Sequence, residues 1–259
     1  MVTVLEWADY GEALGEAGSV LRANAASAGL GAGVPTCPGW TVADLVTHTG
    51  LVHRWAAGRL RGEADRPDAE VEAEASRAAD LLDWLDDGLV DLLNALAATS
   101  DEATGDFYLL DAPGWRFAWA RRQAHETTIH AVDAMGARLG RAPRASEVWF
   151  GPALAADGVD ELLTGHLPRP QYAWTPAAPE RVRVAATDAD RTWEVVLSPG
   201  GAVTSRGAQS QVSPGEPGAV EVSGTCRELY LGLWNRGVEL SCSDAAWWDR
   251  WRERVRVTW

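Results

Sequence analysis

The chain has 259 residues, of which 46% are hydrophobic and 23% are charged, a composition typical of a globular protein with one large domain or two smaller ones. Its formal net charge of −14 argues against general binding to nucleic acids or to anionic membranes. All 23 basic residues are arginine, so chemistry that needs a lysine amine, such as a Schiff base, is excluded.

The first half of the chain is predicted to be helical, because its apolar residues recur every three or four positions. Four long helices with short connections are expected, over residues 4–28, 41–60, 69–98 and 115–139. Thr41 is followed three residues later by Asp44, which indicates a capping-box-like start for the second helix. Four such helices favour an antiparallel bundle.

The second half mixes helical and alternating patterns, which predicts an α+β fold. Further helices are expected over residues 145–165, 225–234 and 244–255. Strands are expected over residues 181–185, 192–197, 219–223 and 238–240, with a hairpin turn at 199–202 and a proline-rich stretch at 168–179. We therefore predict two domains, over residues 1–142 and 143–259.

Several classes of protein are excluded by what the sequence lacks. No apolar run approaches the length of a membrane span, and the first residues do not have the pattern of a signal peptide, so we expect a cytoplasmic protein. The three cysteines, Cys37, Cys226 and Cys242, are widely spaced. An odd number of cysteines with no CxxC pair argues against a disulfide framework and excludes a four-thiolate zinc site.

Two histidine pairs suggest a metal site. Glu126 and His130 are four residues apart on the last predicted helix of the first half, so they share one helical face. Catalytic zinc sites use three protein ligands and keep one position open. His48 and His53 lie on the second predicted helix, but they point about 140° apart, so at most one of them supplies the third ligand. His125 lies off the face of His130 and is a poor candidate.

Three further charged side chains are candidates for supporting contacts. Asp133 is a candidate for hydrogen bonding to a ligand imidazole, and Arg122 is one turn before Glu126, where it can form an ion pair. Arg236 is a candidate for binding a carboxylate, although a surface arginine is the simpler interpretation. A Glu and a His four residues apart also fit a plain surface or buried polar pair.

Three segments of the sequence resemble a known family. Val34–His48, which reads VPTCPGWTVADLVTH, resembles the N-terminal signature of the mycothiol-dependent maleylpyruvate isomerase family. Trp119–Glu126, followed by His130 and Asp133, is similar to a second motif of that family. Ser223–Trp234, followed by Val238, resembles the end of its second domain. The resemblance touches both halves and most of the chain.

The resemblance implies a fold and a set of metal ligands. It implies a DinB-like four-helix bundle followed by a smaller, sterol-carrier-like α+β domain. The family's metal, usually zinc, would be held here by His48, Glu126 and His130. Relatives commonly have arginine directly after the last histidine, whereas this chain has Ala131. That difference bears on contacts to a substrate carboxylate or to the thiol.

The resemblance also implies an enzyme that uses mycothiol as a thiol cosubstrate and a divalent metal. The thiol, activated as a metal-bound thiolate, would attack an electrophilic small molecule, either for cis–trans isomerisation or for S-transfer, and Arg236 would hold acidic groups. One alternative is a thiol-transfer or thiol-exchange tailoring enzyme of natural-product biosynthesis. Another is a non-catalytic module that binds an apolar ligand and has a structural metal with a fourth ligand such as His53. We expect a monomer or a small homo-oligomer that binds no nucleic acid and no membrane.

Overall fold

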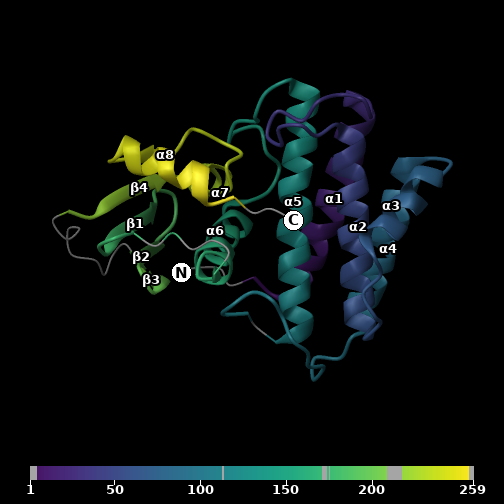
Figure 1. The fold of residues 1–259 in the computed structure, drawn as a ribbon, viewed down its shortest axis with the longest axis horizontal. Coiled ribbons are helices and arrows are strands. Elements are labelled where there is room, and N and C mark those ends of the chain that lie inside the picture. The colour runs from purple at the N-terminus through teal and green to yellow at the C-terminus, as the bar shows by residue number, and fades with distance from the viewer. Residues whose placement is uncertain (1–4, 113, 171–173, 175, 209–217, 257–259) are drawn as a thin grey trace. The chain divides into compact units, whose positions relative to one another are not determined.

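A computed structural model describes residues 5–112, 114–170, 174, 176–208 and 218–256 (Figure 1). The chain divides into two compact units. The helical unit comprises Glu6–Phe107 and Pro113–Pro143, and the mixed unit comprises Met1–Leu5, Tyr108–Ala112 and Arg144–Trp259. The prediction of an α+β protein with a helical first domain and a mixed second domain is confirmed.

Five helices make up the described part of the helical unit. They are α1 (Trp7–Ala28), α2 (Val42–Arg61), α3 (Asp68–Arg77), α4 (Leu81–Ala98) and α5 (Trp115–Leu139). The four long ones form the predicted bundle: α1 packs against α5, α5 against α2, and α2 against α4. The bundle core is therefore lined by one apolar face from each long helix.

The start and the end of α2 follow local sequence signals. The Thr41 hydroxyl accepts a hydrogen bond from the Asp44 backbone N–H, and the Asp44 carboxylate accepts one from the Thr41 backbone N–H. This is the predicted capping box, and it satisfies two backbone donors that the helix leaves free. Gly62 ends the helix in the left-handed conformation, with φ of 73°, where a side chain would be strained.

The prediction of a single third helix over residues 69–98 is wrong. The structure has two helices, because Ala78 is extended and Asp80 caps a new helix. The Asp80 carboxylate accepts hydrogen bonds from the backbone N–H groups of Leu82 and Asp83, at 2.8 and 3.2 Å. The apolar periodicity continues across this break, so the periodicity alone did not reveal it.

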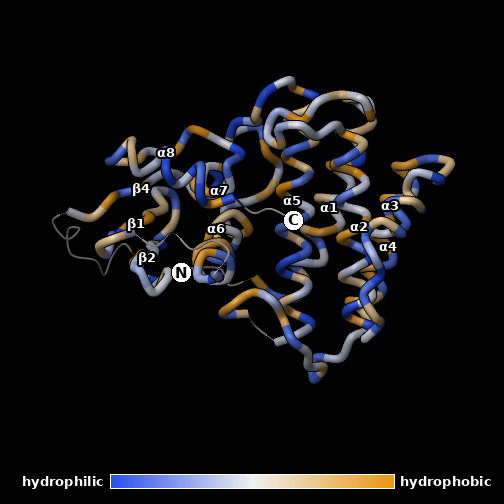
Figure 2. The backbone as a smooth tube through the Cα atoms, in the orientation of Figure 1, coloured by the Kyte–Doolittle hydropathy of each residue, from blue (hydrophilic) through white to orange (hydrophobic). Residues whose placement is uncertain are grey.

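Helix α5 is the most buried element of the helical unit. Every residue from Ala118 to Gly136 is buried, although many of them are polar or charged. Figure 2 shows hydrophilic and hydrophobic segments alternating along this helix. A buried helix with so many polar groups must pair them internally, which makes α5 the natural place to look for a functional site.

The mixed unit contains a five-stranded sheet and several helices. The helical segments are α6 (Pro152–Glu161), the π-helix η1 (Leu162–His166), α7 (Cys226–Leu233) and α8 (Ala245–Arg254). The strands are β1 (Glu180–Ala186), β2 (Thr192–Ser198), β3 (Gly201–Gly207), β4 (Val220–Gly224) and β5 (Ser241–Cys242). The strand order is β3-β2-β1-β4-β5, and among these described strands only the β1–β4 pair is parallel.

One face of the sheet carries the core of the mixed unit. Val182 pairs with Val195, and Val184 pairs with Trp193, so these buried side chains lie on the same face. The Trp193 indole donates a hydrogen bond of 2.9 Å to Asp160 of α6, which joins the helix to that face. The predicted hairpin turn at 199–202 is confirmed, since Ser198 pairs with Gly201 between β2 and β3.

Two further predictions for the mixed unit are wrong. The helix expected over 145–165 begins only at Pro152, and the residue before this proline, Gly151, is extended, as a proline favours. It then widens into the π-helix up to His166. The strand expected over 238–240 lies instead at Ser241–Cys242. Part of the proline-rich stretch at 168–179 lies outside the described residues. Among the described residues, no helix is both long and apolar enough to cross a membrane.

Candidate metal centre

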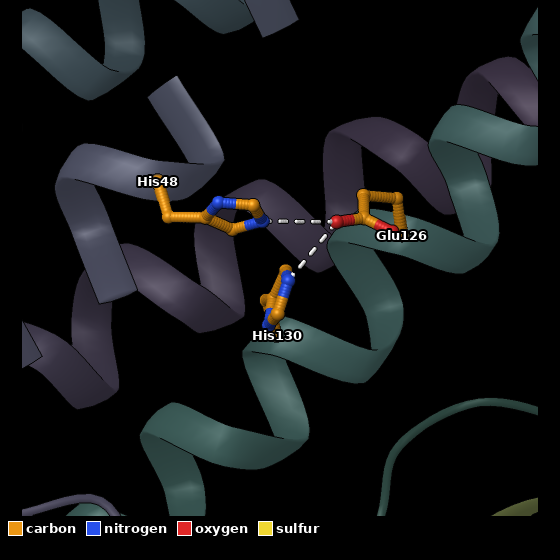
Figure 3. A group of neighbouring side chains, drawn as sticks. All are labelled: His48, Glu126 and His130. Atoms are coloured by element: carbon orange, nitrogen blue, oxygen red, sulfur yellow. Dashed lines mark hydrogen bonds and ion pairs between the residues drawn. The ribbon is translucent and has the colours of Figure 1, made fainter. Parts of the chain in front are cut away.

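Two helices of the bundle bring three metal-ligating side chains together. His48 comes from α2, and Glu126 and His130 come from α5, where their spacing of four residues places them on one face (Figure 3). One ligand atom from each side chain lies within 4.8 Å of the other two. Spacing along the sequence left the choice between His48 and His53 open, and the structure places His48 in the cluster.

The Glu126 carboxylate is at the centre of this cluster. Its Oε1 atom lies 3.0 Å from Nε2 of His130 and 3.4 Å from Nε2 of His48 (Figure 3). The side chains of Glu126 and His130 are almost completely buried, at 1% and 2% exposure, whereas His48 keeps 14% of its side-chain surface exposed. The cluster is therefore enclosed by the bundle and reaches the surface on the His48 side.

Two predicted contacts hold the α5 side chains in place. Arg122 donates a hydrogen bond of 2.7 Å from Nη2 to Oε2 of Glu126, and both side chains are buried. Asp133 lies 3.0 Å from Nδ1 of His130. Because Asp133 occupies Nδ1, the Nε2 atom of His130 is left to face Glu126. Both contacts confirm what the sequence spacing indicated.

The loop before α2 adds contacts that the sequence did not reveal. The Thr36 hydroxyl donates to Asp133 at 2.5 Å, and the Cys37 thiol donates to the other carboxylate oxygen at 3.3 Å. The Trp40 ring stacks on His130 at 6.2 Å between centroids and lies 5.1 Å from the His48 ring. These residues are distant in sequence from α5, so only the folded chain brings them to the centre.

The buried charges of the centre shift one another's pKa values. Burial raises the pKa of Glu126, but His130, His48 and Arg122 outweigh burial and hold that pKa well below its usual range. Burial lowers the pKa of His130, but Glu126 and Asp133 outweigh burial and raise that pKa to about 9. Burial also lowers the pKa of His48. Without a cation, the cluster thus favours a protonated His130 beside an ionised Glu126.

The donor set fits a divalent metal of the zinc type. Two imidazole nitrogens and one carboxylate oxygen are the ligands of several catalytic zinc sites, which keep a fourth position for water or substrate. The Asp133–His130 contact is the usual outer partner of a metal-bound histidine. The chemistry of the donors, their closeness and their burial therefore meet the requirements of such a site.

The three-residue cluster does not include the remaining candidate residues. His53 contacts Thr127 of α5, with 2.9 Å between Nε2 and the hydroxyl oxygen, and His125 packs against the Tyr10 ring of α1. Arg236 belongs to the mixed unit, where its Nη1 donates to the Trp234 carbonyl at 2.9 Å. Cys226 is also in the mixed unit, and burial raises the pKa of its thiol to about 12, so this thiol stays protonated at neutral pH.

The fold and the cluster together define a class: two-unit α+β proteins with a His–Glu–His set of possible metal ligands inside a helical bundle. Comparisons with known proteins identify the family within that class. The model of the mycothiol maleylpyruvate isomerase N-terminal domain matches residues 12–135, and the model of the family's C-terminal domain (MDMPI C-terminal domain) matches residues 153–249. The chain belongs to the mycothiol-dependent maleylpyruvate isomerase family.

Solved structures agree with this assignment at the level of the fold. The chain is similar to the crystal structure of a mycothiol-dependent maleylpyruvate isomerase, with a TM-score of 0.58, 17% identity, and coverage of 92% of this chain and 93% of that one. A histidine-to-alanine mutant of a mycothiol-dependent maleylpyruvate isomerase gives a TM-score of 0.60 at the same identity and coverage. No curated protein matches the sequence.

Proposed function

We propose that this protein is a metal-dependent enzyme that uses mycothiol as a thiol cosubstrate to isomerise an electrophilic small molecule such as maleylpyruvate. One observation carries the proposal: a member of the mycothiol-dependent maleylpyruvate isomerase family has three metal-type donors within 4.8 Å of one another in its bundle. His48, Glu126 and His130 would hold the metal, which is zinc in this proposal.

A divalent metal held by these donors supplies positive charge that lowers the pKa of a coordinated thiol, as it does for coordinated water. The residues of the chain prepare the site for this. Asp133 fixes which nitrogen of His130 faces the centre, and Arg122 holds the second oxygen of Glu126. Trp40 covers the two imidazole rings, which limits the access of water.

The isomerisation itself follows from thiol chemistry. The thiol sulfur adds to a conjugated double bond, so a C–S bond forms and the electron pair of the double bond moves into the neighbouring carbonyl. The former double bond is then single and can rotate. Expulsion of the thiol restores the double bond in the other geometry. The protein needs no nucleophile of its own, and Arg236 would hold an acidic group of substrate or cosubstrate.

S-transfer is a second candidate reaction, in which the thiol stays on the product, as in a tailoring enzyme of natural-product biosynthesis. It is favoured by one observation. Ala131 is fully buried and directly follows His130, and the resemblance to the family implies arginine at this position. A different side chain at this position is expected to alter which substrate the protein accepts, and to leave metal binding unaltered. A panel of electrophiles offered with mycothiol separates the two reactions by whether the product carries sulfur.

The metal is tested first, by elemental analysis of untagged protein beside two variants. Glu126→Gln removes a donor charge, and Glu12→Gln is the matched control on an exposed position of α1. We expect about one zinc per chain in the wild type and in the control, and none in Glu126→Gln. A wild type that takes up no metal on reconstitution would overturn the proposed mechanism.

The coordination number then separates an enzyme from a binding module with a structural metal. A structural site has a closed fourth protein ligand, whereas a catalytic site keeps an open position. His53 contacts Thr127 and is not one of the three clustered donors, which supports the open site. X-ray absorption of the zinc-loaded protein should show three protein ligands and one water. Four protein ligands would favour the binding module.

A further inference from the structure

Helix α5 buries a glutamine whose amide has no hydrogen-bond partner among the described residues. Gln123 is 1% exposed, and neither its amide nitrogen nor its amide oxygen has a partner within the described part of the chain. Buried polar groups are almost always paired, since an unpaired one loses its bonds to water and gains nothing in return. An unpaired amide with two unused groups therefore indicates a missing partner.

The position of Gln123 places that missing partner on the side of α5 that carries Glu126. Gln123 precedes Glu126 by three residues and Thr127 by four, so it lies between them, about 60° around α5 from Glu126. The side of α5 that carries Glu126 and Thr127 faces α2, since these residues contact His48 and His53. The unused amide thus belongs to the α2–α5 interface.

A second unused atom lies in the same interface. His53 is 1% exposed and contacts Thr127 through Nε2, while its Nδ1 has no partner among the described residues. Burial lowers the pKa of His53 to about 3, so the ring is neutral at physiological pH. The Gln123 amide is neutral as well. The interface therefore offers uncharged donors and acceptors, which suit an amide or hydroxyl group better than a carboxylate.

We propose that Gln123 and His53 form a polar subsite that hydrogen-bonds a neutral amide or hydroxyl group of the thiol ligand while its sulfur is at the metal. The proposal rests on the proposed function, since it assumes a thiol at the His48–Glu126–His130 centre. The subsite proposal extends that function by naming the chemical class of the group near the sulfur and the two residues that bind this group. Gln123 supplies both a donor and an acceptor, and Nδ1 of His53 supplies one of either kind, depending on its tautomer.

The subsite is tested by comparing a thiol that carries an acetamido group with a thiol that carries a methyl group in its place. The cobalt(II)-loaded protein is titrated with N-acetylcysteamine and with 1-propanethiol, and binding is followed by the thiolate-to-cobalt absorption band. We expect the amide-bearing thiol to bind about tenfold more tightly, as one buried hydrogen bond implies. Equal affinities would overturn the subsite alone. No band with either thiol would overturn the proposed function and the subsite with it.

Two variants then locate the effect. Gln123→Met keeps the length of the side chain and removes the amide. Thr128→Val is the matched control, because the Thr128 hydroxyl is also buried and has no partner in the described part of the chain, yet it lies about 140° around α5 from Gln123. Both variants should raise the melting temperature of the metal-free protein by about 2–4 °C, since each removes an unpaired polar group.

Only Gln123→Met should abolish the preference for N-acetylcysteamine, while 1-propanethiol binds unchanged. If Gln123→Met keeps the preference, or if Thr128→Val loses it equally, the subsite is overturned. The comparison of the two thiols on the wild-type protein decides the proposal even where a variant fails to fold.

Discussion

Asp133 connects three groups of the metal centre that come from two distant segments. Its carboxylate contacts Nδ1 of His130 and accepts hydrogen bonds from Thr36 and Cys37. An outer partner of this kind makes a metal-bound imidazole more basic and fixes its orientation. The effect of Asp133 on the metal should therefore be large although it is not itself a ligand.

Asp133→Asn is expected to lower zinc affinity about 10- to 100-fold, because the amide carries no charge to support the imidazole. Competition with a chromophoric chelator measures this affinity. Asp87→Asn is the control, since Asp87 is an exposed carboxylate on α4. An unchanged affinity in Asp133→Asn would show that the imidazole needs no support from that carboxylate.

His53 makes the stability of the bundle depend on pH. Its folded-state pKa is lowered to about 3 by burial, which Arg54, His130 and His48 reinforce and Glu126 opposes. The unfolded chain binds a proton to this ring below about pH 6.5, whereas the folded chain does not until about pH 3. The ring therefore costs no stability above pH 6.5, and its cost grows as the pH falls from 6.5 towards 3.

His53→Gln should weaken this acid sensitivity by roughly 2 kcal/mol at pH 5, compared with pH 7.5. Denaturant unfolding of the two metal-free proteins at both pH values measures the difference. The change in stability between the two pH values is taken for each protein separately, so the loss of the Thr127 contact in the variant cancels. Equal acid sensitivity in both proteins would mean that His53 is already protonated in the folded chain.

The residues of α5 could be predicted from the sequence, whereas those on other segments could not. Arg122, Glu126, His130 and Asp133 are neighbours on one helix, so the helical repeat alone placed them together. The choice of His48 over His53 depends on how α2 packs against α5, which spacing does not contain. Only the resemblance to the family indicated His48. The position of Trp40 beside the histidines was not predicted, because a loop has no structural repeat from which the direction of a side chain follows.

At the scale of elements, the approach of α2 to α4 depends on a glycine two residues after His48. A Cβ atom added at Gly50 would overlap the Trp84 ring of α4. The same substitution at Gly15 of α1 meets nothing within 4 Å, which makes it a matched control. Comparing alanine substitutions at these two glycines separates the helix-forming tendency of alanine from its effect on packing.

Gly50→Ala should destabilise the protein by about 1–3 kcal/mol, because the rigid Trp84 ring must move or α2 must shift. Gly15→Ala should instead stabilise it by about 0.5–1 kcal/mol, since alanine favours helix. Thermal unfolding followed by circular dichroism gives both values. Stabilisation by Gly50→Ala would show that the two helices separate at little cost.

The limits of elements were predicted well where a local signal marks them. The Thr41 capping box gave the start of α2, and α5 has the predicted limits of Trp115 and Leu139. The break between α3 and α4 has only a single aspartate as its signal, inside a continuous apolar pattern. Apolar spacing indicates which face of a helix is buried, but it does not indicate whether the backbone is continuous. It therefore predicted one helix where the structure has two.

At the scale of the whole molecule, the segment Tyr108–Ala112 groups with the mixed unit, although it lies between two helices of the bundle in sequence. The Leu110 N–H donates to the Gly165 carbonyl at 3.4 Å, and Arg206 pairs with Asp111 at 2.5 Å. Such contacts between distant segments carry no local pattern. The predicted domain limit between residues 142 and 143 follows the order of the chain, so it assigns Tyr108–Ala112 to the first domain.

The proposed metal ligands all belong to the helical unit, so metal binding should protect that unit selectively. A ligand that binds only the folded state stabilises it by about 2.7 kcal/mol at a free concentration of 100 times Kd. Backbone amides of α2 and α5 carry the ligands, and their hydrogen exchange should slow when zinc is added to the full-length metal-free protein. The amides of β1, β2 and β4 should exchange at unchanged rates. Glu126→Gln should show no change in either unit. Equal slowing in the sheet would show that zinc stabilises both units as one, or that it binds outside His48, Glu126 and His130.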